Sequence, residues 1–249
     1  MTSIRLQARW ISLSALLLTG AAVAGPMQLI ANGGFEAGDF TAWSTVDEAN
    51  SSGAWFVSSS TTSPLSGFAS AGPASGTFYA VTDQTGPGAH VLEQSFTVPS
   101  SATSVIVAFD MFRDDQSGNS GIVGAQGLDF NGDPNQHARV DILLPGSGAF
   151  STAPADIVDN LVAPGADPSG SNPNPYTHYT IDVTGILTAG NSYVLRFGEV
   201  DNQLFFQQGV DNVSVIAQVG ASVAEPPTLV LLVSGLLAVA ALSRRRARA

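Results

Sequence analysis

A short acidic segment in the middle of the chain holds residue types that bind hard cations. Asp129, Asn131 and Asp133 place three oxygen-bearing side chains within five residues. Such side chains ligate calcium in EF-hand loops, but those loops also need an acidic residue at their closing position, and this segment lacks one. The segment therefore predicts either a weak metal loop or an Asx-rich turn.

Several aromatic residues are candidates for sugar binding. Glycan-binding sandwiches stack exposed aromatic rings on sugar faces and use Asn, Gln, Asp and Arg to bind hydroxyl groups. Tyr176 follows an Asn-Pro pair and Phe205-Phe206 lie in a polar stretch, so these rings are expected at the surface, whereas Trp55 suits either environment. We predict glycan contacts at Trp55, Tyr176, Phe205 and Phe206. The alternative is a core position, where aromatic side chains are commonly found.

Other kinds of chemistry lack their residues. The chain has no Cys, which excludes disulfides, Cys-ligated zinc, iron–sulfur clusters and thiol catalysis. It has no Lys, hence no phosphate loop, and no Gly-x-Ser-x-Gly elbow; His90, His137 and His178 are isolated and lack metal-ligand spacing. Carboxylates are abundant, so a glycosidase remains an alternative, although no pair is singled out.

The charge of the chain is very unevenly distributed. All nine basic residues are arginines, with two in the first ten positions and four in the last six. Residues 25–224 hold 19 of the 20 acidic residues against three arginines, a net charge of −16. This excludes nucleic-acid binding through a basic face. It also makes adhesion to anionic polymers dependent on bridging cations.

The elements that position these residues are predicted to be strands. Short apolar runs alternate with Gly, Ser, Asn, Asp and Pro, and helical periodicity is almost absent. The pattern predicts an all-β sandwich or barrel. The ten expected strands are Met27–Ala31, Phe40–Val46, Trp55–Ser59, Thr77–Thr82, Val91–Val98, Ser104–Phe112, Ala138–Leu144, Tyr179–Thr184, Tyr193–Val200 and Val210–Ile216.

The period of two assigns faces to several of these strands. Ser104–Phe109 is apolar on both faces, which is typical of a central strand. Arg196 is expected on the face opposite the core. The side chains expected to point inward are Leu92, Phe96, Val98, Tyr179, Ile181, Val183, Tyr193, Leu195 and Phe197.

Two long stretches are predicted to be loops. They are residues 113–136 and residues 145–177, and both are rich in Gly, Asn, Pro or Ser. One helical turn is expected at Ala155–Leu161. Loops of this length in a compact domain are usually functional or mobile.

Scattered landmarks along residues 27–216 resemble galactose-binding-like jelly rolls of the carbohydrate-binding-module kind. The landmarks are the run from Asn32 to Glu36 followed by Trp43, then Leu92-x-Gln94-x-Phe96, and the closing Val210-Asp211-Asn212-Val213. The resemblance implies a jelly-roll β-sandwich over residues 25–218. It also implies a structural calcium ion between the first and last strands, with Glu36 and Asp211 as ligands.

Asp211 gives this calcium site some independent support. It shares parity with Val213 and Val215, which predicts a carboxylate directed toward the core. A buried carboxylate is costly unless a cation or an Arg neutralises it. The alternative is that Asp211 caps a turn through backbone amides.

Residues 1–24 are predicted to be a secretory signal peptide. Arg5 and Arg9 form a positive start, Trp10–Gly20 is apolar, and Ala22-Val23-Ala24 is a small-x-small cleavage site. A transmembrane helix is the alternative, but the apolar run is shorter than the roughly 20 residues that span a bilayer.

The C-terminal residues predict a short membrane helix with a cationic stop. A linker at 219–227, which contains Glu225 and Pro226, leads into an apolar segment at 228–242. Arg244, Arg245 and Arg246 follow this segment and would stay on the cytoplasmic side of the membrane. Residues 224–249 resemble a PEP-CTERM sorting signal, although Ala224 stands where that motif has its first Pro. The resemblance implies that a Gram-negative bacterium exports the chain across its inner membrane. It also implies an inner-membrane intermediate, recognition by an exosortase, and removal of the tail. A plain membrane anchor is the alternative.

Together these features predict an exported, non-enzymatic protein of the cell surface, extracellular matrix or biofilm. Its sandwich domain is expected to be structural or adhesive, to bind exopolysaccharide, and to be stabilised by calcium. The alternatives are an enzyme acting on polysaccharide and a structural surface protein without a ligand.

Overall fold

The computed structural model describes residues 25–117, 122–132, 134–165 and 172–220, and every regular element within these ranges is a β-strand. The strands are β1 (Gly25–Gln28), β2 (Ser44–Asp47), β3 (Ala54–Ser58), β4 (Tyr79–Asp83), β5 (Gly88–Thr97), β6 (Ala102–Asp115), β7 (His137–Leu143), β8 (Ile157–Gly165), β9 (Thr177–Asp182), β10 (Ser192–Asp201) and β11 (Phe206–Val219). The predicted all-β architecture is therefore confirmed.

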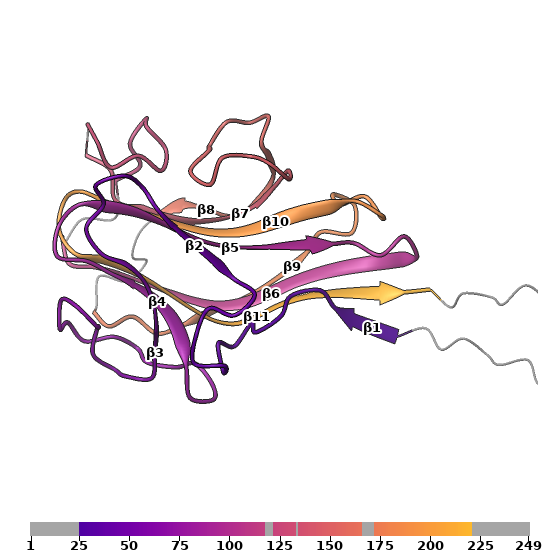
Figure 1. Cartoon of the computed structure of the whole chain (residues 1–249), viewed down its shortest axis with the longest axis horizontal. Helices are drawn as coiled ribbons and strands as arrows, with labels where there is room; N and C mark the ends of the chain where they lie inside the picture. The colour runs from indigo at the N-terminus through magenta and orange to yellow at the C-terminus, as the bar shows by residue number, and fades with distance from the viewer. Residues whose placement is uncertain (1–24, 118–121, 133, 166–171, 221–249) are drawn as a thin grey trace, which may run out of the picture. The chain divides into compact units, whose positions relative to one another are not determined.

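The strands form two antiparallel sheets that pack face to face (Figure 1). Sheet A has the order β3-β4-β11-β6-β9, and β1 pairs with the end of β11. Sheet B has the order β2-β5-β10-β7-β8. The turn between β10 and β11 connects the two sheets at one end of the sandwich, beside the turn between β4 and β5.

The core lies between the inner faces of the two sheets. Apolar side chains alternate along each strand, and burying them supplies most of the free energy of folding. The predicted inward residues of β5 and β10 are buried there, as are Val105, Val107 and Phe109 of β6. Strand β6 lies between β11 and β9, as its two apolar faces suggested.

The predicted helical turn at Ala155–Leu161 is wrong, because this segment enters strand β8. It pairs with β7 through an irregular register that joins Leu143 to Ile157 and Val140 to Val162. The backbone groups at the open edge of β7 need partners, and pairing with them outweighs a local helical preference.

The long loops cover the outer face of sheet B. Leu128, Phe130 and Phe150 pack there against Val91 and Val200, which point away from the main core. Figure 1 shows these loops arching over β7, β8 and β10. This second apolar layer explains why both faces of β5 and β10 are buried.

A bulge in β11 changes the predicted orientation of Asp211. The register with β6 shifts between Asp211 and Ser214, and Asn212 has a left-handed backbone with a φ of 53°. Val210 and Val213 consequently both face the core. Asp211 lies on the outer face of sheet A, so its predicted inward direction is wrong.

The predicted signal peptide, the apolar segment 228–242 and the arginine cluster lie outside the described residues. So do their named positions, Ala22, Ala24, Glu225, Pro226 and Arg244 to Arg246. Among the residues that are described, no helix is long and apolar enough to cross a membrane.

Candidate functional site

A pocket opens at the end of the sandwich where β10 leaves sheet B. Residues 84–87 of the β4–β5 turn and residues 201–205 of the β10–β11 turn line it, and its volume is about 210 Å³. We call it the end pocket. Its walls are two short turns fixed by the strands on either side, so its position follows directly from the sheet register.

The rim of the end pocket combines apolar and amide side chains. The ring of Phe205 lies 4.8 Å, centroid to centroid, from that of Phe68, and Leu204 beside it is 54% exposed. Gln203 is exposed, whereas Asn202 is held by bonds to the Phe130 carbonyl (2.9 Å) and the Asn135 amide (2.7 Å). A partly exposed aromatic ring beside amide groups is suited to a sugar.

The floor of the end pocket carries a buried carboxylic acid. Asp201 is 2% exposed, and burial raises its pKa to about 8, although hydrogen bonds from Gln84 and Gly88 act in the opposite direction. Glu199 lies two residues earlier on β10 and is fully buried. Its burial and the charge of Asp201 raise the pKa of Glu199 well above the usual value. Sequence reasoning did not select either acid.

Glu36 and Asp211 lie at the same loop, residues 74–78, but both bind its backbone. Asp211 Oδ2 accepts hydrogen bonds from the amides of Ala74 (2.9 Å) and Ser75 (3.0 Å), and Oδ1 accepts one from Asn212 (2.7 Å). Glu36 Oε1 accepts from Thr77 (2.9 Å) and Phe78 (3.0 Å), and these bonds lower the pKa of Glu36.

Gly76 lies between these two carboxylates. Its φ is +63°, and a Cβ there would lie 2.3 Å from Glu36 Oε1, so only glycine lets the loop approach so closely.

The carboxylate oxygens of both residues accept from backbone N–H donors, as in the turn-capping alternative. Calcium ligation by Glu36 and Asp211 remains a prediction from the sequence. In the acidic loop, Asp129 Oδ1 accepts from Asn131 N (2.7 Å) and Nδ2 (2.9 Å), forming an Asx turn; Asp133 is outside the described residues.

Of the four predicted glycan contacts, only Phe205 lines the end pocket. Phe206 is fully buried and packs on Ala138, so its predicted exposure is wrong, because the strand alternation turns it inward. Trp55 is 4% exposed and belongs to the core. The ring of Tyr176 packs edge-on against Phe112, and its hydroxyl donates to the Gly72 carbonyl (2.8 Å). Both contacts are within the protein, so this side chain has a structural role.

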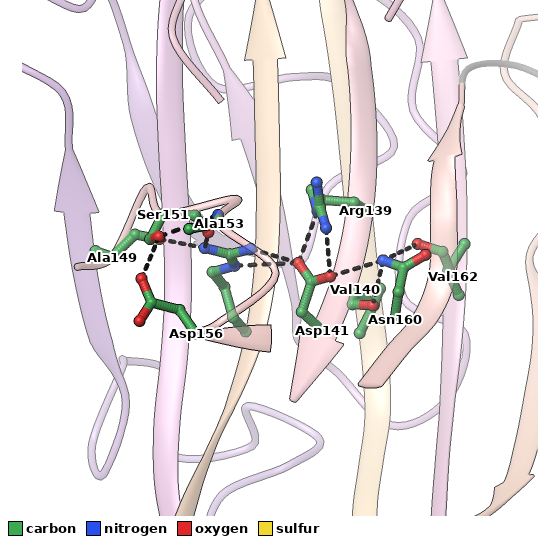
Figure 2. A network of polar contacts seen from close by, with 10 residues as sticks. Arg139, Val140, Asp141, Ala149, Ser151, Ala153, Asp156, Asn160 and Val162 are labelled. Atoms are coloured by element: carbon green, nitrogen blue, oxygen red, sulfur yellow. Dashed lines mark hydrogen bonds and ion pairs between the residues drawn. The ribbon is translucent and has the colours of Figure 1, made fainter. Parts of the chain in front are cut away.

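A buried ion network lies on the outer face of sheet B, under the loop 145–156 (Figure 2). Asp141 accepts from Arg139 (Nε and Nη2, both 2.7 Å) and from Arg196 (Nη2, 2.5 Å). Asn160 also donates to Asp141 (2.6 Å), and Arg196 Nη1 donates to the Ser151 carbonyl (2.7 Å). Arg196 does lie opposite the core, as predicted, but it is fully buried by the loop.

Comparisons with known proteins give only distant likenesses. No protein-family model and no curated protein matches the chain. Three similar solved structures are the carbohydrate-binding module TmCBM61 with β-1,4-galactotriose (12% identity, 76% of this chain and 97% of that one, TM-score 0.46), the enzymatically active domain of bacteriophage CBA120 tailspike protein 4 (9%, 76% and 21%, 0.45), and the K3 cleaved adhesin domain of Lys-gingipain from Porphyromonas gingivalis (17%, 80% and 100%, 0.44).

Proposed function

We propose that the chain is an exported jelly-roll protein whose sandwich domain binds a glycan at the end pocket without hydrolysing it. The observation that supports this most is the rim, where the half-buried Phe205 stands beside Gln203 and Leu204. Small-ligand sites typically combine apolar surface with a few polar groups that fix orientation. The outer face of sheet B is unsuited to this role, because the loops cover it.

The lining of the end pocket also favours binding over hydrolysis. Among the described residues that line it, Asp201 is the one carboxylic acid. Glycosidases usually place two carboxyl groups on either side of the scissile bond. Glu199, the nearest acid along β10, is fully buried beneath the pocket and does not belong to its lining.

Removing the Phe205 ring is expected to abolish most of the glycan affinity. On a glycan array, the purified protein should bind a defined group of saccharides, and Phe205→Ala should weaken that binding about ten-fold or more, since a central aromatic contact is commonly worth more than about 1.4 kcal/mol. Phe205→Tyr keeps an aromatic face and should bind nearly as well as the natural protein. Equal binding by the Ala variant would place the glycan elsewhere.

Export and sorting are proposed from the two ends of the chain. The native protein is expected to begin at Gly25 and to lack the arginine cluster that contains Arg244 to Arg246. Mass spectrometry of protein isolated from the producing cell measures both ends directly. A mature protein that keeps its arginine-rich tail would contradict processing by an exosortase. The C-terminal segment would then be a plain membrane anchor.

A further inference from the structure

Beneath the end pocket, the interior of the sandwich contains an unusual group of oxygen atoms. Glu199 and Asp201 continue the inward register of Leu195 and Phe197 on β10, so they point at sheet A. Gln208 continues the inward register of Val210 on the facing strand β11, and Gln84 follows β4. Acidic and amide side chains from three parts of the chain therefore enter one end of the core.

Most of these oxygens lack protein donors. Within the described residues, both carboxylate oxygens of Glu199, Oδ1 of Asp201, Oε1 of Gln84 and Oε1 of Gln208 are buried without a hydrogen-bond partner. The amide nitrogen atoms are engaged, since Gln84 Nε2 donates to the Phe206 carbonyl (2.5 Å) and Gln84 also hydrogen-bonds the Asp201 carboxylate, while Gln208 Nε2 contacts Met111 Sδ (3.2 Å). The amide oxygens are thus left free by bonds that fix each side chain.

The basic side chains on the neighbouring strands do not pair with Glu199. His90 lies directly opposite it on β5, but its ring nitrogens contact Asp47 Oδ1 (2.7 Å) and the Ser52 carbonyl (3.0 Å). Arg113 shares the inner register of β6, yet no ion pair joins it to Glu199 within the described part of the chain. A buried carboxylate without a partner is strongly destabilising unless a proton or a cation compensates its charge.

We infer that this cluster is a binding site for a hard divalent cation of the calcium class, with Glu199 and Asp201 as the anionic ligands and Gln84 and Gln208 as neutral oxygen ligands. Calcium takes roughly six to eight oxygen ligands and accepts both carboxylate and amide oxygens. Gln84 and Asp201 also line the end pocket, which gives the ion a path from solvent. The cation site is separate from Glu36 and Asp211, and it stands whether or not the pocket binds a glycan.

Calcium titration of the purified full chain tests the site. Isothermal titration calorimetry should detect calcium binding, and calcium at about 100 times its Kd should raise Tm by about 5–10 °C relative to EDTA. Glu199→Gln with Asp201→Asn removes both charges while keeping the side-chain shapes. We expect this double variant to lose the calcium response and to match or exceed the Tm of the natural protein in EDTA.

Two further variants complete the test. Glu199→Gln alone keeps one carboxylate and should weaken calcium binding at least about ten-fold. This single variant replaces the double variant in the test if the double variant does not fold. Glu36→Gln with Asp211→Asn should keep the calcium response. The inference is overturned if the natural protein binds no calcium, if the response survives in the Glu199 and Asp201 variant, or if it depends on Glu36 and Asp211 alone.

Discussion

Asp141→Asn is expected to lower the free energy of unfolding by about 3–5 kcal/mol, because it leaves two buried arginines without their shared counter-ion. Asp141 and Arg196 are both fully buried, and Arg139 is 7% exposed. Burial acts to raise the pKa of Asp141, but the hydrogen bonds and charges of Arg139 and Arg196 outweigh it and lower the pKa. The stabilisation is therefore complete at neutral pH and is lost only as acidification protonates the carboxylate.

Urea unfolding of the natural protein and the variant measures this loss. Asp159→Asn on the neighbouring strand β8 is the matched control, since Asp159 takes no part in the network, and it should change the free energy of unfolding by less than about 0.5 kcal/mol. Because Arg196 also holds the Ala149 and Ser151 carbonyls, the variant should expose the loop 145–156 to proteolysis first. A loss below about 1 kcal/mol would show that the network is not a major source of stability.

The strands were predictable because their signals are local. The alternation of Leu92, Phe96 and Val98 or of Tyr193, Leu195 and Phe197 is visible in the sequence, and burial in the structure follows it. Strand β8 was missed because its irregular pairing with β7 erases the alternation. The direction of Asp211 was missed for a similar reason, since a single bulge reverses the parity of every residue before it.

The site was less predictable, because it depends on which turns meet at one end of the sandwich. Phe205 could be proposed from its polar surroundings, but the sequence did not separate it from the buried Phe206. The signal for the acid pair was present. Glu199 has the parity of Leu195 and Phe197, so the same rule that placed those side chains inward also places this acid inward. Its unpaired oxygens, however, depend on the strands opposite.

The acid pair predicts that the metal-free protein loses stability as the pH rises from about 5 to 8. Burial raises the pKa of Asp201 to about 8, and that of Glu199 is raised as well, whereas both are near 4 in the unfolded chain. In this window the folded state binds more protons than the unfolded state. Each additional bound proton lowers the free energy of unfolding by about 1.4 kcal/mol for every pH unit of increase.

Urea unfolding in EDTA at several pH values measures this slope. Glu199→Gln with Asp201→Asn should flatten it, because the amides do not titrate, whereas Glu36→Gln should not, because the pKa of Glu36 is lowered and lies below the window. Comparing the double variant with the natural protein isolates the contribution of Glu199 and Asp201. A slope that is the same in both proteins would mean that the pair does not hold protons.

Calcium should reverse this pH dependence, which distinguishes a cation site from a pair that only stores protons. Carboxylates must lose their protons to ligate a metal, so calcium binding strengthens as the pH rises. In saturating calcium, the free energy of unfolding of the natural protein should therefore hold level or rise between pH 5 and 8, while the falling slope persists in EDTA. The same falling slope under both conditions would leave Glu199 and Asp201 as a protonated pair without a metal.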